Sequence, residues 1–161
     1  MTRIGALLAL LVTGCGSKGA VSVLATIEMP HAAVAKASTI ALTLNGDFTL
    51  HLELGSVAPS STDVSISGGF ALVRPSDQLA FIAPKLDSKP PPPYHLEPGG
   101  HVDAAITIAE KTGTPGQMIN QATFDAICQS RSVQFSGTLS DSQSPTPTPV
   151  SSLPFDVTGC P

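Results

Sequence analysis

Two histidines and two carboxylates near the middle of the chain are the residues whose types and spacing could carry chemistry. One residue separates His95 from Glu97, and one residue separates His101 from Asp103. Side chains two positions apart share a face of a β-strand, and the intervening Gly99-Gly100 could fold one pair against the other. Two imidazoles and two carboxylates would then meet, which is a ligand set suited to Zn²⁺ or a similar divalent ion.

The same segment has a second interpretation as a solvated hairpin. A surface turn built from proline and glycine is expected to carry polar neighbours, and Asp103 would face solvent simply because Val102 faces inward. The chain also lacks the ligand motifs of zinc proteases, cupins and blue-copper proteins. We therefore expect no cofactor. Zinc or a similar metal held by His95, Glu97, His101 and Asp103 remains the alternative.

Other catalytic constellations are missing from the sequence. It contains no Gly-x-Ser-x-Gly elbow, no phosphate-binding glycine loop and no Cys-x-x-Cys pair. His51, beside Glu53, falls on the polar phase of a predicted strand and is expected to be solvated. His31 follows Pro30 and is expected in a loop. These patterns favour a protein that is not an enzyme.

The amino terminus has the parts of a secretion signal. Arg3 supplies a positive head, and the apolar run 4–12 is too short to span a bilayer as a helix, which needs about 20 residues. The run ends in Val12-Thr13-Gly14-Cys15, which resembles the bacterial lipobox of an aliphatic residue, a small residue, Gly or Ala, and Cys. The resemblance implies that residues 1–14 are a signal peptide and that Cys15 becomes the lipid-bearing first residue of a lipoprotein.

The lipobox resemblance also implies a location. Three acyl chains on Cys15 would hold the protein in the bilayer, because each buried methylene contributes about 0.8 kcal/mol. Gly16 stands where Asp would be a retention signal, which resembles lipoproteins passed to the outer membrane. We expect a protein on the bacterial outer membrane, facing the periplasm or the cell surface, with the membrane and an envelope protein as partners. Residues 15–19 would be the lipidated Cys and tether, and 20–161 a single domain.

The composition supports an extracytoplasmic β protein. The net charge is −4 and only 12 % of residues are charged, so the basic face that nucleic-acid binding needs is not expected. The chain has 14 Gly and 15 Pro beside many Ser and Thr, which suits short strands joined by turns. The composition therefore favours a non-enzymatic binding or structural module and excludes nucleic acid as a partner.

Assigning Cys15 to lipid leaves Cys128 and Cys160 as a pair. In an oxidising compartment these two cysteines are expected to form a disulfide. The closed loop of about 33 residues would contribute roughly 3.7 kcal/mol by the chain-entropy model. Two free, buried thiols are the alternative.

About eight short strands separated by turn signals, without a βαβ rhythm, predict a mainly β fold, an antiparallel immunoglobulin-like β-sandwich. The first strand is expected over 20–27. The segment 96–101, Leu-Glu-Pro-Gly-Gly-His, resembles the Leu-x-Pro-Gly turn of bacterial immunoglobulin-like domains. The Trp expected of antibody-type domains is absent, so the resemblance implies a shared architecture.

The segment 38–54 predicts a β-hairpin. Apolar residues alternate with polar ones on both sides of Asn45-Gly46-Asp47. A two-residue loop at Asn-Gly would place Leu42 opposite Thr49, whereas a three-residue loop pairs Leu44 with Phe48. The pattern therefore favours the three-residue loop.

The segment 115–129 predicts a short helix. Thr114 would be the N-cap, Pro115 the first helical residue and Gln117 the third, as in a capping box. A strand is the alternative, because Phe124 and Cys128 belong to an alternating set with Ala122 and Ala126.

Overall fold

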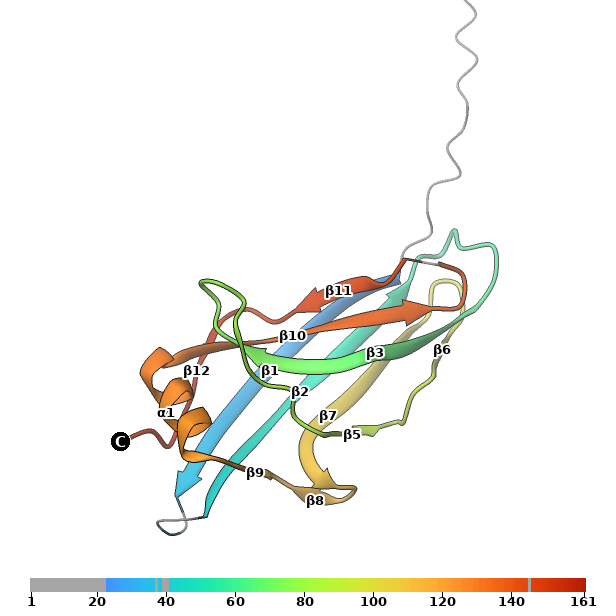
Figure 1. Ribbon diagram of the computed structural model, residues 1–161. Coiled ribbons are helices and arrows are strands. Elements are labelled where there is room, and N and C mark those ends of the chain that lie inside the picture. Colours follow the sequence, from blue (N-terminus) through green and yellow to red (C-terminus); the bar gives the residue numbers. More distant parts are fainter. Residues whose placement is uncertain (1–22, 37, 39–40, 145) are drawn as a thin grey trace, which may run out of the picture.

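The computed structural model describes residues 23–36, 38, 41–144 and 146–161, and it shows two antiparallel sheets packed face to face with one short helix (Figure 1). The predicted antiparallel β-sandwich is confirmed. The expected signal peptide, Cys15, the tether and the first residues of the predicted strand 20–27 lie outside the described residues.

The first sheet has the strand order β1-β2-β7-β5, with β9 also paired to β2 and β8 to β7. The chain enters this sheet three times: with β1 and β2, then with β5, and then with β7 to β9. The strands between these groups belong to the second sheet. The strands of the first sheet are β1 (Val23–Lys36), β2 (Leu42–Leu54), β5 (Leu86–Lys89), β7 (His101–Lys111), β8 (Thr114–Pro115) and β9 (Gln117–Ile119).

The second sheet has the order β11-β10-β3-β4, with β12 also paired to β10 and β6 to β3. Its strands are β3 (Thr62–Val73), β4 (Ala80–Ile82), β6 (Tyr94–Leu96), β10 (Ser132–Asp141), β11 (Thr148–Ser151) and β12 (Phe155–Asp156). The segment 90–93 joins β5 of the first sheet to β6 of the second. The last two residues of the Ser/Pro/Thr-rich stretch 144–149 belong to β11.

The core lies between the sheets and takes every second residue of the long strands. The even-numbered side chains of β2 are at most 3 % exposed, and Phe48 is central to them. Its ring lies 5.0 Å from that of Phe70 on β3 and 4.8 Å from that of Phe135 on β10. Offset and edge-on aromatic contacts of this kind stabilise a core beyond the area that they bury.

The predicted hairpin at Asn45-Gly46-Asp47 is wrong, because β2 runs through these residues without turning. Gly46 pairs with Ala32 of β1 and is buried. A Cβ at Gly46 would lie 2.8 Å from the His31 carbonyl oxygen and 2.9 Å from Ile108 Cδ1. The glycine therefore permits close packing rather than a turn. Even-numbered residues keep the buried face from Leu42 to Leu54, so one strand satisfies the alternation as well as a hairpin does.

The predicted helix exists but begins later, as α1 (Gln121–Ser130). Asn120 is the N-cap, and its side chain accepts a hydrogen bond of 2.8 Å from the Thr123 backbone N–H. Residues 114–119 form β8 and β9 instead, because strand pairing places Ile119 in the core opposite Leu42. No helix among the described residues has the length and apolar character needed to cross a membrane.

The predicted disulfide between Cys128 and Cys160 is present and joins α1 to the carboxyl end of the chain. Both cysteines pack against the core. Just before Cys160, Thr158 bonds to the free edge of β1: the Val34 N–H donates to the Thr158 carbonyl at 2.9 Å, and the Thr158 N–H donates to the Ala32 carbonyl at 3.1 Å. The bridge therefore holds a segment that closes one side of the sandwich.

Candidate functional site

The structure divides the predicted metal-binding residues between the two sheets. His95 lies on β6, with Glu97 just beyond it, and β6 pairs with β3. His101 and Asp103 lie on β7, which pairs with β2. The Gly99-Gly100 turn therefore leads from one sheet to the other and does not fold the two pairs against each other.

His95 is held between two carboxylates. Its Nδ1 lies 2.8 Å from Asp63 Oδ1, and its Nε2 lies 3.1 Å from Glu97 Oε1. With both nitrogens donating, the charged imidazolium is the favoured form. The hydrogen bond to Asp63, followed by that to Glu97, raises the pKa of His95 above 6.5. This arrangement leaves no lone pair on the ring for a metal ion.

Tyr94, which precedes His95 on β6, is buried. The Ser88 hydroxyl donates to the Pro90 carbonyl at 2.7 Å, so the Tyr94 hydroxyl donates to Ser88 Oγ at 2.6 Å. Burial raises the pKa of Tyr94. Because Tyr94 belongs to β6 and Ser88 to β5, this bond ties the two sheets together.

The other half of the predicted site meets two residues of β2. His51 pairs with Asp103, and Glu53 pairs with His101 in the next cross-strand position. We call His51, Glu53, His101 and Asp103 the sheet quartet. Each histidine faces a carboxylate across the strands, so histidines occupy one diagonal and carboxylates the other. The His51 and His101 ring centroids are 5.7 Å apart.

Strand periodicity explains why the sheet quartet faces outward. The even-numbered residues of β2 and, from 102 to 108, those of β7 fill the core, including Leu52 and Ala104. The odd-numbered residues therefore lie on the opposite face. The sequence identified the outward phase of both strands. It did not reveal the quartet, because the register that places residue 51 opposite residue 103 depends on pairing between strands about 50 positions apart.

Asp103 dominates the electrostatics of the sheet quartet. The His51 Nδ1–H donates to Asp103 Oδ1 at 2.5 Å. This hydrogen bond is the largest cause of a raised pKa at His51, with smaller contributions from the charges of Asp103, Glu28 and Glu53, while burial acts in the opposite direction. The bond also fixes the ring orientation, so Nε2 carries the lone pair in the neutral form.

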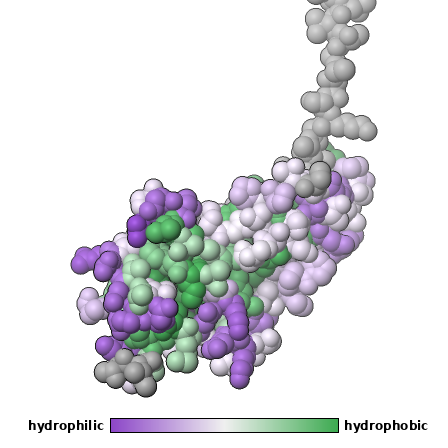
Figure 2. All heavy atoms as spheres, in the orientation of Figure 1, coloured by the Kyte–Doolittle hydropathy of each residue, from purple (hydrophilic) through white to green (hydrophobic). Residues whose placement is uncertain are grey.

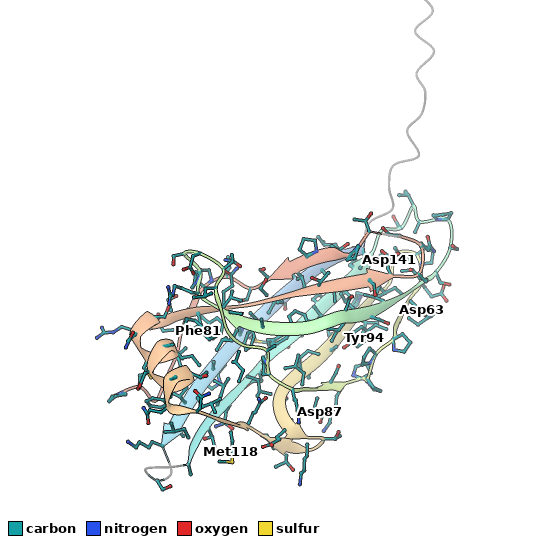
Figure 3. The ribbon with its side chains drawn as sticks, viewed as in Figure 1. Asp63, Phe81, Asp87, Tyr94, Met118 and Asp141 are labelled. Carbon is teal, nitrogen blue, oxygen red and sulfur yellow. A yellow bond between two sulfur atoms is a disulfide. The ribbon has the colours of Figure 1, made fainter. Side chains whose placement is uncertain are left out.

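The end of the sandwich where β1 begins is acidic. Glu53, Asp63, Glu97 and Asp141 gather there, because β2 and β10 end at this edge while β3 begins at it. Figure 3 shows Asp63 and Asp141 near this end, whereas Asp87 and Met118 lie toward the other. The lysines and arginines of the described residues lie farther along the strands: Lys36, Arg74, Lys85, Lys89, Lys111 and Arg131.

An open hollow of about 490 Å³ lies at the opposite end, between the β3–β4 turn and the end of α1. Its one ionisable lining residue is Arg74, which forms an ion pair of 3.2 Å with Asp77. Apolar residues gather beside α1 on the face shown in Figure 2, flanked by hydrophilic ones. The hollow brings no nucleophile and base together, so the titratable chemistry of the described residues centres on the histidines.

Comparison with known proteins leaves the family open. No family model matches the chain, and no curated protein and no solved structure matches it. Among the described residues, no group of three or more His, Cys, Asp or Glu side chains is arranged so that it could hold a metal ion.

Proposed function

We propose that the protein is a lipid-anchored protein of the bacterial outer membrane whose β-sandwich acts as a non-enzymatic binding or structural module. The observation that carries this proposal is the Cys128–Cys160 disulfide. It uses two of the three cysteines of the chain and suits an oxidising compartment. Cys15, in its lipobox-like context, is the cysteine that remains for lipid.

The position of β1 supports anchoring at Cys15. The first described strand begins at Val23, eight residues after Cys15. Eight extended residues reach at most about 29 Å. A lipid on Cys15 would therefore keep the acidic end of the sandwich close to the membrane surface.

The charge at that end indicates what must supply the membrane affinity. Its ionisable side chains are carboxylates and histidines rather than lysines or arginines among the described residues. Electrostatic attraction to anionic lipid needs basic clusters. Acyl chains on Cys15 would therefore provide the attachment.

The exposed face of the first sheet supports binding rather than catalysis. The sheet quartet occupies a broad β surface, and Asp103 has a side chain that is 56 % exposed. Enzyme sites are usually concave and exclude water. An exposed sheet face suits contact with an ion or an envelope partner.

Fractionation of cells that express the full-length chain tests the anchor. The wild-type protein is expected in the outer-membrane fraction and in the detergent phase after detergent partition. Cys15→Ser should leave that phase, because the thioether cannot form. The matched control, Cys128→Ser with Cys160→Ser, should remain in it. Equal partition of the wild-type and Cys15→Ser proteins would contradict the proposal.

A further inference from the structure

We propose that the free edge of β1 over Val23–Glu28 pairs antiparallel with the same segment of a second copy of this chain. β1 is the outermost strand of the first sheet (Figure 1). Two copies related by a two-fold axis would therefore join their first sheets into one continuous sheet. Pairing of this kind rests on the backbone of β1 and does not require lipid on Cys15.

The direction of the backbone groups of β1 follows from its pairing with β2. Val23 lies opposite Leu54, and the Leu54 N–H donates to the Gly100 carbonyl on the other side of β2 at 3.0 Å. In an antiparallel ladder, a pair of this kind exchanges no hydrogen bonds, so both residues point their backbone groups away from each other. Val23 therefore directs its N–H and carbonyl to the outer edge. Alternation gives Ala25 and Ile27 the same direction.

The hydrogen bonds at the other end of β1 agree with this direction. A bulge between Glu28 and His31 shifts the register by one residue, so that Ala32 and Val34 become the outward residues. The Ala32 carbonyl and the Val34 N–H are the groups that bond Thr158. Thr158 thus covers the edge of β1 beyond the bulge.

The edge before the bulge is open. In the part of the chain that the structure describes, no backbone group bonds the outer side of Val23–Glu28. Proteins commonly protect sheet edges with short strands, lysine or proline. The other strands that end the two sheet orders, β4, β5 and β11, have three or four residues each, and β5 ends at Lys89 while β11 contains Pro149. Val23–Glu28 contains neither lysine nor proline, so it is open to an added strand.

A register centred on Ala25 satisfies the backbone of two copies. Val23 of each copy meets Ile27 of the other, and Ala25 meets Ala25 of the second copy. All of these residues point their backbone groups outward, and each pair exchanges two hydrogen bonds. Three pairs therefore give about six bonds. The side chains of Val23 and Ile27 are buried and apolar, so the same register aligns apolar residues on the core side.

The exposed side chains suit the same register. Leu24 is 57 % exposed, and it would lie opposite Thr26 of the second copy, in a closely spaced pair that covers its apolar surface. Glu28 is the one charged residue of the segment. Because Glu28 lies three positions from the axis, the two copies of this residue would be about 20 Å apart along the strands. The register therefore opposes no like charges, which would destabilise the pairing.

Paired cysteine substitutions in the full-length protein test the register. In the variant Leu24→Cys with Thr26→Cys, each new thiol would face a new thiol of the second copy, with Cα atoms about 4.5 Å apart. This distance is within the range that a disulfide spans. After oxidation we expect a covalent dimer on a non-reducing gel, and reduction should remove it. The wild-type chain, which has the same native cysteines, gives the background.

The matched control is Thr26→Cys with Glu28→Cys. Its thiols have the same spacing on the same face of β1, but neither would face a cysteine of the second copy. We therefore expect the control to run as a monomer. Cross-linking of the control to an equal or greater extent, or of neither variant, would overturn the proposal.

Charge substitutions test the association without a covalent bond. The detergent-solubilised wild-type protein should sediment as a dimer. Leu24→Lys with Thr26→Lys would oppose lysines twice and should shift the dimer to monomer, whereas Leu24→Lys with Thr26→Glu would oppose unlike charges and should remain dimeric. Circular dichroism checks that each variant is folded, and the cysteine comparison decides if one is not. A monomeric wild-type protein, or equal sedimentation of the two folded charge variants, would overturn the proposal.

Discussion

At the residue scale, three of the four histidines lie within 3.4 Å of a carboxylate oxygen from another strand. His31 lies 3.4 Å from Asp47, His51 lies 2.5 Å from Asp103, and His95 lies 2.8 Å from Asp63. The partners are 16 to 52 positions away in the chain. The sequence placed His51, His101 and Asp103 on outward faces, but it could not pair them, because cross-strand contacts depend on register.

The pKa of His95 is the first prediction. Nuclear magnetic resonance titration should give a value above 6.5, because the two carboxylates stabilise the charged ring. Asp63→Asn should lower this pKa more than Glu97→Gln does, since the bond to Asp63 is the larger cause. A wild-type value at or below 6.5, or a larger effect of Glu97→Gln, would contradict the described geometry.

The same group predicts a pH dependence of stability. A pKa that is higher in the folded than in the unfolded chain gives stability that is fully present below about 6.5, the unfolded value, and lost as the pH rises through the folded value. Urea unfolding of wild type and His95→Gln, compared at acidic and at alkaline pH, should differ more at acidic pH. A larger stability difference between wild type and His95→Gln at alkaline pH would show that His95 is not stabilised as a cation.

At the element scale, apolar alternation predicted the strand phases correctly, and local turn and cap signals were less reliable. Asn45-Gly46 is a strong hairpin signal on its own, yet β2 continues through it because Ala32 and Ile108 pack against Gly46. Thr114 and Asn120 both suit an N-cap, and pairing of β9 with β2 decides in favour of Asn120. Contacts between strands of the first sheet decided both cases.

Gly46→Ala tests whether close packing explains the uninterrupted strand. The new methyl group would meet a backbone oxygen of His31 and the side chain of Ile108 at less than 3.0 Å. We expect a loss of about 1 to 3 kcal/mol in the free energy of unfolding. Gly55→Ala is the matched control, because a Cβ there meets nothing within 4 Å. Equal stability of the two variants in urea unfolding would contradict the packing explanation.

At the scale of the whole molecule, the C-terminal segment closes the sandwich on the β1 side. Thr158 bonds to the edge of β1, and Cys160 is fixed to α1 by the disulfide. The sequence predicted the bridge through the pairing of cysteines. The contact of Thr158 with β1 was not predictable, because it consists of backbone hydrogen bonds that bring Ala33 beside Thr158.

Removing the bridge should destabilise the sandwich without changing its location. Cys128→Ser with Cys160→Ser should lower the free energy of unfolding by about 3 to 4 kcal/mol, the chain-entropy value for a loop of this length. Each single variant should lose a similar amount, because one serine already abolishes the bond. Denaturant unfolding measures the loss. Additive losses in the double variant would show that each cysteine contributes separately, which would contradict the expectation.

Lipid on Cys15 is the claim on which the proposed location depends, and intact-mass spectrometry of the full-length protein purified from membranes tests it directly. We predict a mature chain that begins at Cys15, carries the added mass of acyl chains and retains the Cys128–Cys160 bond. A chain that begins at any other residue, or one that begins at Cys15 without acyl mass, would contradict the proposal.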